Sequence, residues 1–429
     1  MILYMAVFII TAVIGVFSEK KIMNPISVLF VMWGMIIFFS KLGLYGLFDT
    51  QSNLPYTIIS VGLTAFALGY YGFRILQNNK PVYLFISKKS KRQNKINYKV
   101  CYILLIFCIV VSSLKIIEMG INIYSTGLNF LSIGEKIASA SREGHNKVIN
   151  FLYFYCASPV YIAATIIFTV DFWLGKRDKK LTILTLLMVF FRSITTGGRI
   201  AIIQLLISFL TSYSFALENN KHILLKISTN RKRKREIIIF CFSIAILFYY
   251  MSLSRGFNLF KNLYLSFAIQ PYLLEHWCAE LESNYAYGFC SLNGFIYPVL
   301  YLIKNLLGMP ELPGIFSDIY NTVQATFNEW VICGDSSKCN AYTSAFWYLY
   351  YDGRLFGVFL GMFIWGCIAF NNFVKAKLKN NALSVANYCV IMIALVYTFT
   401  DMEYNKASFV LGLLYMNYFC FNQKKEVEK

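Results

Sequence analysis

The sequence predicts an all-α polytopic membrane protein, and three observations carry this prediction. Hydrophobic residues make up 58% of the 429 residues, and charged residues only 14%, compared with about 25% in soluble domains. The apolar residues form runs of about 20, long enough to cross the hydrocarbon as helices that satisfy their own backbone. The segments between these runs alternate sharply in charge. This composition excludes an ordinary cytosolic enzyme, a disordered chain and a disulfide-rich miniprotein.

We expect about eleven transmembrane helices. The apolar runs lie at approximately 1–17, 25–46, 56–76, 98–117, 148–172, 181–196, 200–217, 237–253, 343–371, 382–399 and 407–421. The sixth and seventh runs are separated only by Gly197-Gly198-Arg199, so they are expected to form a tight helical hairpin.

The distribution of positive charge predicts the orientation of the chain. If all eleven runs span, 27 of the 40 basic residues fall on one side. Cytoplasmic loops of membrane proteins carry such an excess, so we expect the N-terminus outside and the C-terminus in the cytoplasm. The same rule explains the net charge of +19, and nucleic acid is not an expected partner. The first run lacks a basic leader and a small-residue cleavage site, which favours a retained anchor over a signal peptide.

Two longer loops fall on the side opposite the basic loops. The smaller, 118–147, contains an amphipathic stretch at 121–137, and the larger covers 254–342. Tyr, Phe, Leu and Trp are frequent in the larger loop, so we expect helices that lie at the membrane interface. The predicted organisation is eight helices over 1–253, the large loop 254–342, and three helices with a cytoplasmic tail over 343–429.

Four cysteines of the large loop predict disulfides. Cys278, Cys290, Cys333 and Cys339 form an even set in a segment that is expected to face an oxidising compartment. The local pairing is Cys333–Cys339 with Cys278–Cys290, and two crossed pairings remain possible. A zinc site is the alternative, but the spacing lacks a paired C-x-x-C. No nucleotide-binding or haem motif occurs, so neither a metal nor a cofactor is expected.

Arginines near the expected non-cytoplasmic boundary are the first candidate site residues, because burying charge near lipid is costly. Arg199 follows Gly197 and Gly198 and opens a helix, where backbone N–H groups and the helix dipole favour an anion. Arg255 and Arg142 follow the same logic, since arginines clamp a diphosphate bidentately. The alternative is that these side chains snorkel to lipid headgroups, which is also our expectation for Lys115.

Acid–base candidates lie in and after the large loop. Glu275 and His276 are adjacent, and His276 could act as a base near neutral pH. Asp352 opens the ninth run within Tyr351-Asp352-Gly353-Arg354, where it could activate a hydroxyl or orient Arg354. The alternatives are a packed interfacial histidine and an acid that forms a local ion pair.

Several arginines, many spans and no ATP motif together favour a substrate that is lipid-borne and already energised. A polyprenyl-diphosphate sugar meets this description, because its diphosphate is a good leaving group. The protein would supply charge stabilisation, orientation and one base. Aromatic residues of the large loop are suitable for stacking on sugar faces.

Three segments resemble the bacterial oligosaccharide repeat-unit polymerases of the O-antigen polymerase type. They are Thr195-Thr196-Gly197-Gly198-Arg199, then Ser254-Arg255-Gly256 before a long loop, and Asn340-Ala341-Tyr342-Thr343 followed by Tyr350-Tyr351-Asp352-Gly353 and a glycine-rich span. The family usually has Asp-Phe-Gly in the last segment, whereas here Gly353 follows Asp352 directly.

This resemblance implies a membrane glycosyltransferase of GT-C-like architecture in the bacterial inner membrane, working at its periplasmic face in O-antigen or capsule synthesis. It would join oligosaccharide repeat units carried on undecaprenyl diphosphate. Arg199 and Arg255 would contact the diphosphate, and Asp352 and Tyr351 would lie in or near the site. A chain-length regulator would be a possible partner. The alternatives are an O-antigen ligase, which uses the same donor, and a lipid-linked oligosaccharide flippase. A membrane O-acyltransferase is disfavoured because no span contains a histidine.

Overall fold

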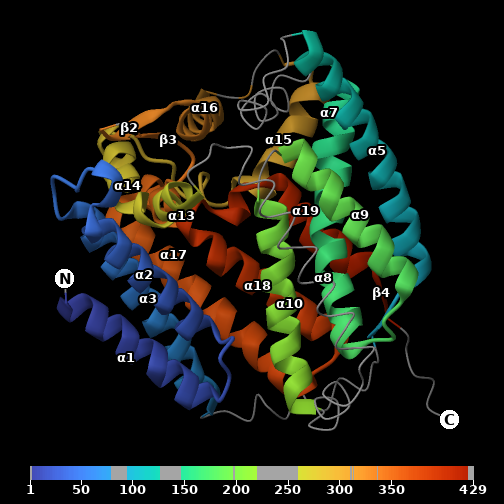
Figure 1. Cartoon of the computed structure of the whole chain (residues 1–429), viewed down its shortest axis with the longest axis horizontal. Helices are drawn as coiled ribbons and strands as arrows, with labels where there is room; N and C mark the ends of the chain where they lie inside the picture. The colour runs from blue at the N-terminus through green and yellow to red at the C-terminus, as the bar shows by residue number, and fades with distance from the viewer. Residues whose placement is uncertain are drawn as a thin grey trace. The chain divides into compact units, whose positions relative to one another are not determined.

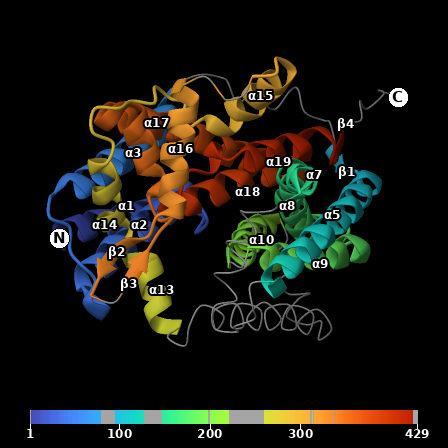
Figure 2. The same cartoon turned by 90° about the horizontal axis from the view of Figure 1, so that it is seen from above.

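The computed structural model describes residues 2–78, 94–125, 146–196, 199–219, 259–309, 312, 314–335 and 337–423. Most of these residues are helical (Figures 1 and 2). The chain divides into two compact units, one built from 1–90, 260–375 and 391–410, and the other from 91–259, 376–390 and 411–429. We call them the first and the second unit and describe each by itself.

The first unit combines the N-terminal helices with the segment after residue 259. Its elements are α1 (Ile2–Glu19), α2 (Pro25–Leu42), η1 (Leu44–Gly46), α3 (Leu54–Asn78), α13 (Leu259–Ala268), α14 (Gln270–Ala279), α15 (Asn293–Leu306), α16 (Gly314–Asn328), β2 (Val331–Gly334), β3 (Ser337–Cys339), most of α17 (Ser344–Lys379), η4 (Tyr397–Phe399) and η5 (Glu403–Asn405).

The second unit is a helical bundle. Its elements are β1 (Asn94–Ile96), α5 (Tyr98–Ser125), α7 (Lys147–Leu152), the π-helical turn η3 (Tyr153–Ala157), α8 (Ser158–Leu174), α9 (Lys179–Thr196), α10 (Ile200–Asn219) and β4 (Phe421–Gln423). Helix α5 packs on α9, and α8 packs on α10 (Figure 2). Helices α18 (Ala382–Val396) and α19 (Ala407–Tyr418) contribute residues to both units.

Seven helices in the described residues are long and apolar enough to cross a membrane: Pro25–Leu42, Leu54–Gln77, Tyr98–Ile121, Lys147–Leu174, Ile200–Leu217, Ser344–Lys379 and Ala382–Phe399. They correspond to seven of the eleven expected runs. Val7–Glu19 and Ala407–Tyr418 are shorter apolar helices. Helix α9 covers the expected run 181–196 but is not among the seven, and the expected run 237–253 lies outside the described residues. The helical, membrane-embedded character is supported, while the count of eleven and the orientation stay predictions.

Helices α3 and α17 approach each other through glycines. A Cβ atom on Gly69 would lie 2.1 Å from the backbone oxygen of Phe363, and one on Gly366 would lie 2.3 Å from that of Phe66. Ordinary contacts need well over 3 Å, so only glycine fits at either position. Small residues at a helix crossing are typical of membrane bundles, where close backbone packing drives helix association.

Helix α17 is broken near its start, which the sequence pattern did not predict. Gly353 (φ −168°, ψ 31°) and Arg354 (φ 55°, ψ −144°) leave the helical region, so a short N-terminal piece is followed by a long C-terminal piece. The guanidinium of Arg354 donates to the carbonyl oxygens of Glu282 and Asn284 at 2.7 and 2.9 Å. The break therefore lies against the segment that follows α14.

The loop before α3 is attached to the β2–β3 hairpin. Leu47 forms an isolated antiparallel bridge with Gly334. The amide of Phe48 donates to the carbonyl of Cys333 at 2.9 Å, and that of Asp335 donates to the carbonyl of Gly46 at 3.2 Å. These contacts join segments that are almost 290 residues apart in sequence.

Helix α15 exposes an apolar stripe, as expected for an interfacial helix. Phe295, Val299, Leu302 and Leu306 recur at helical spacing, and each is 46–84% exposed. Such a face is typical of helices that lie in the plane of a membrane surface. The placement of the large loop at the membrane interface stays a prediction.

Lys115 corrects an expectation. The side chain was expected to snorkel to the surface, but it is fully buried in the second unit. Its ammonium contacts the carboxylate of Glu118 at 3.0 Å and donates to the side-chain oxygen of Asn150. Helix α5 also continues to Ser125, beyond the expected end at 117, so Lys115 pairs with Glu118 of the same helix, whose side chain is 12% exposed, in place of a lipid headgroup.

Candidate functional site

Arg199 lies at the start of α10 in the second unit. Its carbonyl accepts the first backbone hydrogen bonds of that helix, from Ile202 and Ile203, each at 3.1 Å. The residue is buried, with 8% of its surface exposed. The remaining residues of the predicted diphosphate site lie outside the described residues: Arg142, Gly197, Gly198 and Arg255. The convergence of Arg199 and Arg255 on one headgroup therefore stays a prediction.

Arg192 lies on α9, seven residues before Arg199 in the sequence, and its side chain is used within the second unit. Its guanidinium donates to the hydroxyls of Tyr153 and Ser158, the latter at 2.7 Å. The same group lies over the rings of Tyr153 and Tyr161. These contacts fix α9 against η3 and α8, so a structural role accounts for Arg192.

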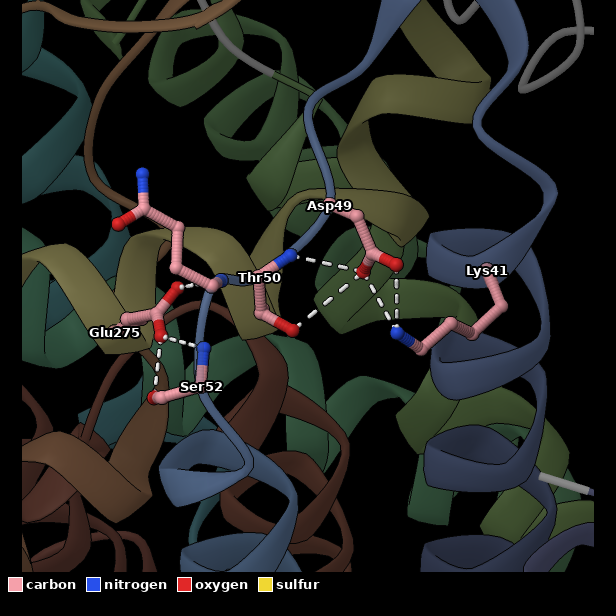
Figure 3. A network of polar contacts seen from close by, with 6 residues as sticks. Lys41, Asp49, Thr50, Ser52 and Glu275 are labelled. Carbon is pink, nitrogen blue, oxygen red and sulfur yellow. Dashed lines mark hydrogen bonds and ion pairs between the residues drawn. The ribbon is translucent and has the colours of Figure 1, made fainter.

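Glu275 holds the start of α3 in the first unit (Figure 3). One carboxylate oxygen accepts from the amide of Gln51 at 2.8 Å, and the other accepts from the amide of Ser52 at 2.6 Å and from its hydroxyl. In the same turn, Asp49 pairs with Lys41 at 2.7 Å. These hydrogen bonds fix the loop that leads into α3. The structure thus gives Glu275 a structural contact with this loop, and its catalytic role stays a prediction.

His276 is half-buried on α14 beside Glu275. Its ring meets that of Trp277 edge to face, with the centroids 5.1 Å apart. The neighbouring carboxylate of Glu275 is directed to the backbone at 51–52, so it does not complete a histidine–carboxylate pair in the described contacts. The proposed role of His276 as a base also stays a prediction.

Asp352 lies at the break in α17 and holds the turn that precedes α15. Its two carboxylate oxygens accept from the amides of Cys290 and Ser291 at 2.9 and 3.0 Å. The backbone carbonyls of Tyr351 and Asp352 accept from the amides of Ala286 and Tyr287. The carboxylate therefore orders 286–291 and forms no described ion pair with Arg354. Asp352 and Tyr351 are both buried in the first unit.

A charged cluster that the sequence analysis missed follows α18. The ammonium of Lys406 contacts the carboxylates of Asp401 at 2.9 Å and Glu403 at 2.8 Å. The residues Asp401 and Glu403 are 5% and 6% exposed, and one third of the Lys406 side chain is exposed. Burial lowers the pKa of Lys406, but the two carboxylates outweigh it and raise this pKa above its usual value of 10.5. Lys406 is therefore charged at neutral pH.

This charged cluster is joined to the turn that Asp352 orders. The side-chain amide of Asn405 donates to the carbonyl of Cys290 at 2.7 Å. A Cβ on Gly294 would lie 2.5 Å from the carbonyl oxygen of Tyr404 and 2.7 Å from that of Lys406. The start of α15 thus packs directly on the 403–406 backbone. A sequence signal was present, because Asp401, Glu403 and Lys406 are the only charged residues between Lys379 and Lys424.

The two predicted cysteine pairs of the large loop differ in whether their sulfurs are in contact. Cys333 and Cys339 lie on the paired strands β2 and β3, and their sulfurs are 2.9 Å apart, with a thiol hydrogen bond between them. That bond lowers the pKa of Cys333 and raises the pKa of Cys339. Cys278 and Cys290 are both buried, and burial raises the pKa of each thiol. The structure brings the first predicted pair together and gives no contact for the second within the described residues.

Metal ligation has no candidate in the part of the chain that the structure describes, where no three histidine, cysteine or acidic side chains form a possible ion site. Comparisons of the chain with protein-family models, with curated proteins and with solved structures found no match.

Proposed function

We propose that the protein is a membrane glycosyltransferase that joins lipid-linked oligosaccharide repeat units, with a polyprenyl diphosphate as leaving group. One observation carries this proposal. The segment that resembles the repeat-unit polymerases, 340–353, contacts two turns of the first unit, 286–291 and 400–406. Ser344 donates its amide to the carbonyl of Thr400 at 3.0 Å, and Asp352 binds the amides of Cys290 and Ser291.

The composition of this polar region supports the proposal. Buried carboxylates are expensive beside lipid and are retained mainly where they serve a function. In a chain that is 58% hydrophobic, the first unit buries the carboxylates of Asp352 and Asp401 beside two short turns. On the expected topology these turns follow the ends of spans on the non-cytoplasmic side, where a lipid-linked glycan would be presented.

Arg199 is the proposed contact to the diphosphate. A buried guanidinium at a helix start combines a fixed positive charge with the positive end of the helix dipole. Its planar fork suits a phosphate better than an ammonium does.

The surface glycan of a deletion strain tests the proposal. Loss of a polymerase leaves a single repeat unit on the carrier or acceptor, whereas loss of a ligase leaves none and loss of a flippase leaves the glycan in the cytoplasmic leaflet. Complementation with wild-type protein should restore the ladder of chain lengths. Arg199→Ala should leave single units at unchanged protein level, and Arg199→Lys should recover part of the ladder.

Arg177→Ala is the matched control, because it removes the same charge near the opposite end of α9. This variant should give a complete ladder. Full-length ladders in the deletion strain itself would reject the proposed function, and a complete ladder with Arg199→Ala would reject the diphosphate contact.

A further inference from the structure

Asp401 has one carboxylate oxygen in use and one without a partner. Its Oδ2 atom contacts the ammonium of Lys406 at 2.9 Å. Its Oδ1 atom is buried, and no described residue donates a hydrogen bond to it. The residue is only 5% exposed. Leaving a buried acceptor unsatisfied costs about 1–3 kcal/mol, and more for a charged group, so such an atom calls for a specific explanation.

Three other carboxylates of the first unit, those of Glu275, Asp352 and Glu403, are engaged differently. Both oxygens of Glu275 accept backbone amides, as do both oxygens of Asp352. Glu403 contacts Lys406 at 2.8 Å and has a further interaction of its own. Among these four acids, Asp401 is the one with a free acceptor atom in the described structure.

A second unpartnered polar atom lies on the neighbouring segment. The amide of Ser344 donates to the carbonyl of Thr400, the residue before Asp401. The Ser344 hydroxyl is fully buried and has no partner among the described residues. Ser344 also has φ +67°, a left-handed conformation that costs a non-glycine residue about 1–3 kcal/mol and is often found at functional sites.

The charge of the cluster defines the class of ligand. Asp401 and Glu403 carry two negative charges against the single positive charge of Lys406, which leaves a net charge of −1. Such a cluster repels a diphosphate. The two atoms without a partner are a carboxylate oxygen of Asp401 and the hydroxyl of Ser344 on the neighbouring segment. A neutral ligand that presents hydroxyl groups satisfies both. A saccharide has this chemistry.

We propose that Asp401 receives the attacking hydroxyl of the acceptor glycan and takes its proton during transfer. This inference rests on the proposed function. The hydroxyl oxygen forms a bond to the anomeric carbon of the donor, and the bond from that carbon to the diphosphate oxygen breaks. The electron pair leaves with the polyprenyl diphosphate, and the proton passes to Asp401 Oδ1 and then to water. The hydroxyl of Ser344 helps to hold the acceptor.

The test compares Asp401→Asn with Glu403→Gln in the full-length protein. Both substitutions remove one negative charge from a contact with the same ammonium, so Glu403→Gln is a matched control. The purified variants, in detergent micelles, receive a synthetic polyprenyl-diphosphate-linked repeat unit as donor and acceptor, and chain extension is followed on gels. A general base contributes about 10²–10⁴-fold. We expect Asp401→Asn to lose at least about 100-fold in extension rate and Glu403→Gln to stay within a few-fold of wild type.

The outcomes separate the two proposals. If wild-type protein does not extend the glycan, the proposed function fails. If wild type extends it and Asp401→Asn does so at a similar rate, or if both variants lose activity equally, the role of Asp401 is wrong and the cluster is structural. Should Asp401→Asn fail to fold, the double variant Asp401→Asn with Lys406→Gln removes both members of the Asp401–Lys406 ion pair. This double variant must also lose extension at least about 100-fold, and near wild-type extension would overturn the inference.

Discussion

The close contact of α3 and α17 gives the sharpest stability prediction. Gly69→Ala places a methyl group 2.1 Å from the backbone oxygen of Phe363. This atom belongs to a helix backbone and cannot rotate away, so the helices must separate by more than about 1 Å to reach van der Waals contact. Overpacking of this kind costs about 1–3 kcal/mol. Separation also weakens the reciprocal contact at Gly366.

Gly72→Ala is the matched control on the same helix. A Cβ there has no atom within 4 Å, and alanine is favoured over glycine in a helix by about 0.5–1 kcal/mol. Both alanines gain this propensity, so the two variants should differ by the overpacking cost of Gly69→Ala, about 1–3 kcal/mol in stability. At about 2–4 °C per kcal/mol, this corresponds to a difference in melting temperature of at least about 2 °C.

Thermal unfolding of the purified protein in detergent micelles, followed by size-exclusion chromatography with fluorescence detection, measures this difference. Gly69→Ala should melt well below wild type, and Gly72→Ala at or above it. Equal melting temperatures for the two variants would refute the backbone-to-backbone packing of α3 on α17.

Three further predictions follow from polar contacts. Glu275→Gln should lower the free energy of unfolding by about 1–2 kcal/mol, seen as a lower melting temperature, and should retain chain extension. Loss of extension at an unchanged melting temperature would instead support a catalytic role. Cys333 and Cys339 should resist alkylation in intact cells until a reductant is added, and free thiols at both would exclude the disulfide. Lys406→Gln should reduce stability at pH 7. Because the pKa of Lys406 is raised in the folded state, its contribution is complete below pH 10.5 and is lost as pH rises through the folded-state pKa. The gap in melting temperature between wild type and Lys406→Gln should therefore narrow only above pH 10.5, and a gap that closes between pH 7 and 9 would contradict the ion pairs.

The long apolar runs were predictable because a membrane span is a local property of the sequence. Twenty apolar residues carry the signal of α3 or α18 without reference to any partner. The end of α2 differs from the expected run 25–46, because Gly43 adopts the left-handed conformation that terminates the helix at Leu42. The break at Gly353 was not predictable, because the carbonyls it frees are satisfied by amides at 286–287, far away in sequence.

The candidate site was predictable only in part, because polar roles depend on partners. Glu275 looks like a base in sequence, but the loop amides that it binds lie more than 220 residues away. Lys115 looks like a snorkelling side chain, but its partners in the fold keep it buried. Asp401 could not be predicted in the same way, because it lies in a short acidic loop between two spans that contains no arginine, the residue that suits a diphosphate.

The pairing of residues 46–48 with the β2–β3 hairpin limits how the large loop can be studied. An excised fragment covering 260–342 would lack the edge to which Gly334 and Asp335 bind, and Glu275 would lose the loop amides at 51–52 that it binds. Such a fragment would expose unpaired main-chain groups and an apolar stripe on α15 at once, which favours aggregation. Antibodies and labels aimed at this region are therefore best raised and read out on the intact chain in a lipid-like environment.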